Sequence, residues 1–78
     1  RSLAIECKST KKLKKYLTKD EVEDLIRFSE MFGAEAIIGL RVDRKGWTFF
    51  NADELVDSGK FYVADSSKGI EFSELIED

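Results

Sequence analysis

The sequence has 78 residues, of which 42% are hydrophobic and 37% are charged, with a formal net charge of −3. This length allows one domain with a modest core, and the composition excludes both a disordered chain and an apolar membrane span. A single cysteine excludes an internal disulfide, and the absence of histidine removes histidine-based acid–base chemistry and metal ligation. No signal peptide is visible, so we expect an intracellular, cytoplasmic protein.

The charge is unevenly distributed along the chain. Residues 1–19 hold seven bases and one acid, which gives +6, whereas residues 20–78 hold six bases and fifteen acids, which gives −9. The basic segment indicates a polyanionic partner. The net negative charge of residues 20–78 argues against nonspecific binding of nucleic acid over the whole protein surface.

The first predicted element is a strand over residues 3–8, in which apolar and polar residues alternate. We expect its odd-numbered apolar face to pack on the core and its even-numbered face to carry Glu6 and Lys8. A carboxylate and an ammonium group side by side can hold a divalent cation and a nearby water for phosphodiester hydrolysis. Most Glu-x-Lys pairs on strands are solvated ion pairs of little energetic value, so this motif alone is a weak signal.

The next segment, residues 9–15, is rich in lysine and predicts a loop. Two interpretations remain open for this loop, since it either contacts phosphate groups or only solubilises the surface. A short strand is expected to follow at Tyr16 and Leu17.

A helix is predicted from the capping-box pair Thr18 and Glu21 to about Phe32, with Gly33 as its stop. We assign Glu21 to capping. The apolar residues of the helix cover an arc of about 200°, whereas about 100° suffices for one core face. These six residues are Val22, Leu25, Ile26, Phe28, Met31 and Phe32. The first three can face the sheet, and the last three would have to be buried by another part of the chain or by a second subunit.

The near-continuous apolar run over residues 36–42 is typical of a central strand buried on both faces. The order strand, helix, strand, strand predicts a mixed sheet with the helix packed on one face. The remaining predicted elements are a turn at 43–46, a returning strand at 47–50, a short helical turn within 51–59, an edge strand at 61–64, a turn at 65–69 and a helix that begins within 72–78.

Longer segments extend the Glu-x-Lys motif: I-E-C-K-S-T at 5–10, Y-L-T-K-D-E-V-E-D-L-I-R-F-S-E-M-F-G-A-E-A at 16–36, G-W-T-F-F at 46–50 and Y-V-A-D-S at 62–66. Over nearly the whole chain this pattern resembles the archaeal Holliday junction resolvases, whose nuclease fold has an Asp followed by Glu-x-Lys as its signature. The resemblance implies an α/β fold with a central mixed β-sheet flanked by helices and a restriction-endonuclease-like core. It also implies that residues 1–78 are a single nuclease domain lacking its N-terminal helix and first strand or strands.

The resemblance further implies roles for matching residues. Glu6 would be catalytic and bind the metal, the backbone carbonyl of Cys7 would face the metal, and Lys8 would orient or activate the attacking water. The expected cofactor is Mg²⁺, with Mn²⁺ as the alternative. The residues assigned to DNA binding are Ser9, Lys11, Lys12, Lys14 and Lys15. The residues assigned to a homodimer interface are Phe28, Met31 and Phe32, of which the two phenylalanines match aromatic residues of the family.

The chain also departs from the family pattern. A second metal-binding Asp and a Glu on an N-terminal helix would both lie before Arg1. One carboxylate and one carbonyl make a poor Mg²⁺ site, so we predict that this 78-residue chain alone does not cleave DNA.

The whole protein is expected to be a Mg²⁺-dependent endonuclease that resolves four-way (Holliday) DNA junctions as a homodimer, in the cytoplasm with the nucleoid and away from any membrane. A sliding clamp is a candidate accessory partner. Three alternatives remain: a repair or restriction-type endonuclease of the same fold, a catalytically inactive relative used for DNA binding or dimerisation, and a plain interaction module with a lysine-rich loop.

Overall fold

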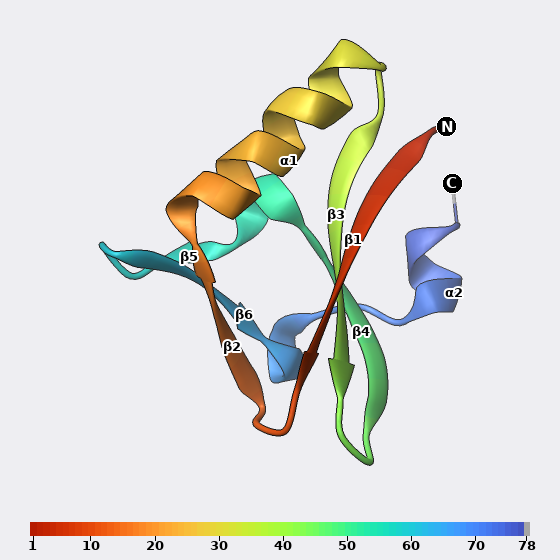
Figure 1. Cartoon of the computed structure of the whole chain (residues 1–78). Coiled ribbons are helices and arrows are strands. Elements are labelled where there is room, and N and C mark those ends of the chain that lie inside the picture. The colour runs from red at the N-terminus through yellow and green to blue at the C-terminus, as the bar shows by residue number, and fades with distance from the viewer. Residues whose placement is uncertain (78) are drawn as a thin grey trace.

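The computed structural model describes residues 1–77, which form two three-stranded sheets and two helices of unequal length (Figure 1). The strands are β1 (Leu3–Thr10), β2 (Lys14–Thr18), β3 (Glu35–Val42), β4 (Gly46–Asn51), β5 (Val56–Asp57) and β6 (Phe61–Asp65). The helices are α1 (Lys19–Met31) and α2 (Phe72–Leu75), with single 3₁₀ turns η1 (Ala52–Glu54) and η2 (Ser66–Lys68).

The first sheet has the order β1-β3-β4, with β1 parallel to β3 and β4 antiparallel to it. The predicted mixed sheet is therefore confirmed. Its central strand is β3, whose Ile37, Ile38 and Leu40 are all 0% exposed, as the apolar run predicted. The register places Glu6 beside Ile38 and Lys8 beside Leu40.

The second sheet has the order β2-β6-β5 and is antiparallel throughout. Two expectations are wrong here. The predicted loop over residues 9–15 shrinks to residues 11–13, because β1 runs on to Thr10 and β2 begins at Lys14. The predicted edge strand at 61–64 is instead the central strand β6, because β2 and β5 pair with its two sides. Both errors concern pairing between segments that are distant in the sequence.

Helix α1 begins and ends as its sequence predicts. The hydroxyl of Thr18 accepts a hydrogen bond from the backbone N–H of Glu21 at 3.2 Å, and the Glu21 carboxylate accepts one from the backbone N–H of Thr18 at 3.3 Å. This reciprocal pair is the capping box. At the other end, Gly33 follows with φ of +65°, a left-handed conformation that glycine adopts without steric cost.

The apolar arc of α1 is divided as expected. Val22 is fully buried, and Leu25 and Ile26 pack on the core beside Ile38 and Leu40. The surplus residues Phe28, Met31 and Phe32 are 56%, 77% and 67% exposed. The rings of Phe28 and Phe32 lie 4.9 Å apart between centroids, so they form one continuous apolar surface on the helix.

The expected orientation of β1 is wrong. Its odd-numbered face was expected on the core, but Ile5 is 41% exposed and Cys7 is also exposed. The long helix α1 instead covers the face of the sheet that carries Glu6 and Lys8. The short helix α2 lies on the opposite side of the sheet and covers only the Leu3 end of the odd face (Figure 1). A helix of four residues is too short to shield the remainder.

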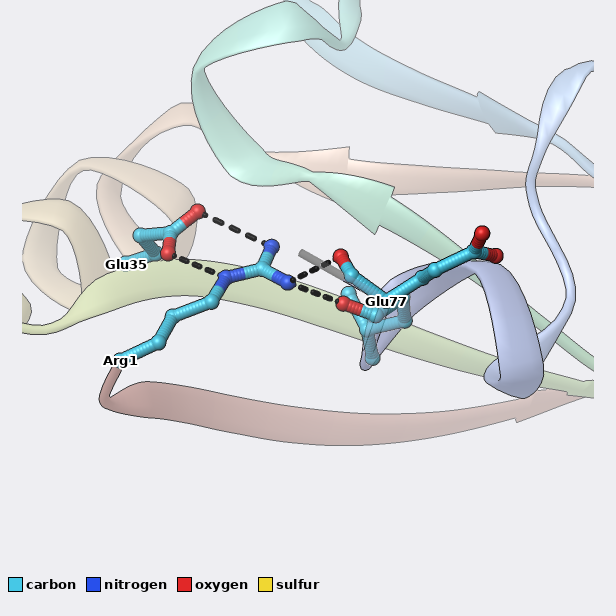
Figure 2. Close-up of polar contacts among 4 residues, drawn as sticks. Arg1, Glu35 and Glu77 are labelled. Atoms are coloured by element: carbon cyan, nitrogen blue, oxygen red, sulfur yellow. Dashed lines mark hydrogen bonds and ion pairs between the residues drawn. The ribbon is translucent and has the colours of Figure 1, made fainter.

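Arg1 connects the beginning of both parallel strands to α2 (Figure 2). Its Nε donates to Oε2 of Glu35 at 2.7 Å. Its Nη1 donates to the backbone carbonyls of Leu75 at 2.5 Å and Glu77 at 3.2 Å. The carbonyl of Leu75 is the last one in α2, so Arg1 satisfies a group that has no partner within the helix.

The remaining expectations for the C-terminal third hold in outline. The short helical turn within 51–59 is η1, and the helix expected within 72–78 is present as α2. Asp78 lies outside the described residues. Across residues 1–77, no helix has the length and apolar character that a membrane crossing requires.

Candidate active site

Strand β1 presents Glu6 and Lys8 on the face covered by α1. Because side chains two residues apart on a strand point the same way, the two groups are neighbours. The Lys8 Nζ lies 3.6 Å from Oε2 of Glu6, and the two side chains are 29% and 39% exposed. They therefore lie at the boundary between core and solvent, where both can reach an external molecule.

Lys8 has a second and nearer partner, Glu21 in the first turn of α1. The Lys8 Nζ lies 2.6 Å from Oε1 of Glu21. The sequence assigned Glu21 to capping alone, and the structure gives it both roles. The N3 position of a capping box was the available signal that Glu21 lies at the helix start, but nothing local indicates that this turn packs against Lys8.

The pairing changes the proton affinity of both groups. The nearby Lys8 ammonium group lowers the pKa of Glu21, with desolvation opposing it and the hydrogen bonds from Thr18 adding to it. The Glu21 carboxylate likewise raises the pKa of Lys8, against desolvation. Both groups are consequently charged at neutral pH.

A hollow between β1 and α1 brings three acids together with the aromatic surface of the helix. It is lined by Glu6, Glu21, Asp24, Leu25 and Phe28, among others. Phe28 also belongs to the apolar surface assigned to dimerisation. The structure therefore places the candidate catalytic residue Glu6 in the same hollow as part of that surface, a relation that sequence spacing did not indicate.

The predicted DNA-binding residues gather elsewhere, at the carboxyl end of β1. A second hollow there is lined by Ser9, Lys11, Lys12, Lys15, Arg41 and Asp43, among others. Lys14 does not line it and pairs in register with Asp65 across to β6. Arg41 was missed, although an isolated arginine within an otherwise apolar strand was a usable signal. Its position is explained by the β1–β3 register, which sets Arg41 beside Ser9.

The described residues alone do not complete a magnesium site. Within residues 1–77, no three histidine, cysteine, aspartate or glutamate side chains lie close enough to hold a metal ion together. Glu6 supplies one hard carboxylate, whereas Mg²⁺ takes six oxygen ligands in near-octahedral geometry, several of them waters. We therefore assign no reaction step to a metal on these residues alone.

The fold is mixed α/β, with the Glu-x-Lys pair on an outer strand of its first sheet, as the resemblance to a nuclease family led us to expect. The family model described as archaeal Holliday junction resolvase (hjc) matches residues 1–78. The chain belongs to this family.

Individual relatives agree with this assignment. The chain is 43% identical over 76 residues to the crossover junction endodeoxyribonuclease Hjc of Archaeoglobus fulgidus. The matched region covers 94% of this chain and 56% of the relative. It is 36% identical over 77 residues to the protein of the same name from Methanocaldococcus jannaschii, and this match covers 95% of the chain and 57% of that relative. The solved structure of Archaeoglobus fulgidus Hjc, a Holliday junction resolvase from an archaeal hyperthermophile, matches with a TM-score of 0.87 and 42% identity, covering 96% of this chain and 65% of that one. The chain thus spans little more than half the length of the curated relatives it matches.

The Lys8–Glu21 pair predicts how stability responds to acid. Because the folded-state pKa of Glu21 is lowered, its contribution is complete above about pH 5 and is lost as the pH falls through that lowered value. Glu21→Gln retains a capping residue but cannot titrate, so its loss of stability in acid should be smaller than that of the wild type. Urea unfolding at about pH 7 and about pH 3.5 measures the difference. Lys8→Met should reduce the acid dependence similarly, and an unchanged dependence in both variants would show that the pair does not form in solution.

Proposed function

We propose that the whole protein is a structure-specific endonuclease that resolves four-way DNA junctions by metal-dependent phosphodiester hydrolysis. The observation that carries the proposal is the placement of Glu6 and Lys8 side by side on β1, in a chain of this family. The names of its relatives, crossover junction endodeoxyribonucleases, support the same substrate. Chromosomal junctions as substrate would place the protein in the cytoplasm, with the nucleoid.

In this proposal Glu6 and the backbone carbonyl of Cys7 would be ligands of Mg²⁺ or Mn²⁺, and the other ligands would come from outside residues 1–78. Once bound, such an ion lowers the pKa of its water and stabilises negative charge on phosphate. Lys8 contributes a compact ammonium group that can contact both a water and a phosphate oxygen. Its partial exposure leaves it accessible to the DNA backbone.

The basic hollow would hold backbone phosphates next to the site. Four cations line it, namely Lys11, Lys12, Lys15 and Arg41. Helix α1, by contrast, is acidic in its first turn and is therefore unsuited to reading base edges in a groove. We infer recognition by junction shape and phosphate spacing.

The exposed apolar surface of α1 would be the contact between two copies of the protein. Phe28, Met31 and Phe32 form an exposed apolar patch that includes two contacting aromatic rings, and a patch of this kind is typical of a protein–protein interface. A two-fold axis through this patch would place two sites symmetrically, one for each of two opposing strands of a junction.

The catalytic role is tested by Glu6→Gln in the full-length protein with Mg²⁺. Cleavage of a labelled four-way junction should fall by at least about 1,000-fold, since several kcal/mol of charge stabilisation are lost, while junction binding changes little. Glu54→Gln, an acidic residue of η1 outside the hollow, is the matched control and should cut normally. Full cleavage by the Glu6 variant would remove Glu6 from the mechanism.

Equal cutting of linear duplex by the wild type would favour a repair or restriction-type enzyme.

The basic hollow is tested by replacing Lys11 and Lys12 together with alanine. Binding should weaken for junctions of every sequence, and the slope of log affinity against log salt should fall by about 2 units, one for each phosphate contact. Fluorescence anisotropy over a salt series measures both quantities. The control is the Lys60 and Lys68 pair, which lies outside this hollow. A loss confined to certain sequences would contradict recognition by shape.

The dimer is tested by Phe28→Ser combined with Phe32→Ser. Both side chains are exposed in the single chain, so the double variant should remain folded and become monomeric at micromolar concentration. Light scattering coupled to size exclusion gives the mass. Tyr16→Ser removes an exposed aromatic ring from β2 and should leave the dimer intact. A dimer that survives loss of both phenylalanines would exclude this surface as the interface.

A further inference from the structure

Lys8 lies between two carboxylates, and the nearer one is not part of the Glu-x-Lys motif. Its Nζ is 2.6 Å from Glu21 on α1 and 3.6 Å from Glu6 on β1. A lysine carries its charge on a long flexible stem, so the position of the ammonium group is set by the partners within its reach. Here the stronger contact comes from the helix.

We propose that Glu21 is a positioning residue of the nuclease site, holding the Lys8 ammonium group against α1 so that its contact with Glu6 remains the longer of the two. The proposal rests on the proposed nuclease function and deepens it. Without Glu21, the nearest opposite charge for Lys8 is Glu6, which shares its face of the strand. Closer pairing there would move the ammonium group and occupy the carboxylate assigned to the reaction.

The helix cap fixes Glu21 for this task. Its Oε2 accepts hydrogen bonds from the backbone N–H of Thr18 at 3.3 Å and the Thr18 hydroxyl at 2.9 Å. Its Oε1 is shielded from solvent and accepts no hydrogen bond of good geometry, and the Lys8 ammonium group, 2.6 Å away, is its ion-pair partner. A carboxylate oxygen removed from water requires a cation or a donor, so Lys8 and Glu21 depend on each other. One oxygen closes the helix cap while the other holds the lysine.

The other acid of α1 in the same hollow has a different partner. Asp24 pairs with Arg27 on the next turn of the helix, where both side chains are well exposed. It does not compete for Lys8. Asp24→Asn therefore removes the same charge from the same hollow without touching the proposed contact, and it is a matched control.

The experiment uses the full-length protein with Mg²⁺ and a labelled four-way junction, at a temperature where every variant is folded. Glu21→Met keeps the side-chain length and removes the acceptor, whereas Glu21→Gln keeps an acceptor oxygen and the cap. Thr18→Ala weakens the cap and keeps the carboxylate. We expect Glu21→Met to lower the single-turnover cleavage rate at saturating enzyme by about tenfold, as for one lost charged contact, with an unchanged junction Kd. Glu21→Gln should recover most of this rate. Thr18→Ala loses the hydroxyl contact to Glu21 but keeps the one from the backbone N–H, so its rate should lie between those of Glu21→Met and the wild type. Asp24→Asn should cut at nearly the wild-type rate.

A double-mutant cycle tests the contact independently of cleavage. In urea unfolding, the effects of Lys8→Met and Glu21→Met should be non-additive, and those of Lys8→Met and Asp24→Asn additive. Additive effects for Lys8 and Glu21 would overturn the inference. So would a wild-type cleavage rate in Glu21→Met, and in that case the proposed nuclease function would stand. A wild-type protein that cuts no DNA would instead overturn the proposed function, and the positioning role with it.

Discussion

The parallel pairing of β1 with β3 is the constraint on which the candidate site depends. β3 is buried at the centre of its sheet, and the register sets Glu6 beside Ile38 and Lys8 beside Leu40. Parallel strands require a long crossover connection, which β2 and α1 supply here. Since Ile38 and Leu40 are covered by that crossover helix, the first turn of α1 is brought against Lys8. The same packing that buries the core therefore assembles the polar site at its margin.

The electrostatics of the site follow from this packing. Two carboxylates and one ammonium group meet between β1 and α1, and the described residues there retain an excess of negative charge. A cluster of lysines lies beyond the carboxyl end of β1, around a different hollow. Positive and negative surfaces are thus separated along one strand. In the proposed function, the first would hold the DNA backbone and the second would carry out hydrolysis.

Two apolar surfaces remain exposed, one on α1 and one on β1, because helices of different length cover the two faces of the first sheet. The long helix α1 covers one face of the sheet and still exposes Phe28, Met31 and Phe32 on its outer side. The short helix α2 covers only part of the opposite face, which leaves Ile5 at 41% exposure. Apolar alternation along β1 therefore identifies a strand correctly while giving no information on which face is covered.

The sequence by itself determined the features that arise from neighbouring residues. The capping box at Thr18, the end of α1 at Gly33, the buried strand β3 and the common face of Glu6 and Lys8 all follow from spacing over a few positions. Only the tertiary structure decided which face of β1 is covered, that β6 is central in a second sheet, that Arg41 joins the lysines and that Glu21 binds Lys8. Each of these depends on contacts between segments far apart in the chain. Their energy comes from packing and pairing across the fold, which no local pattern encodes.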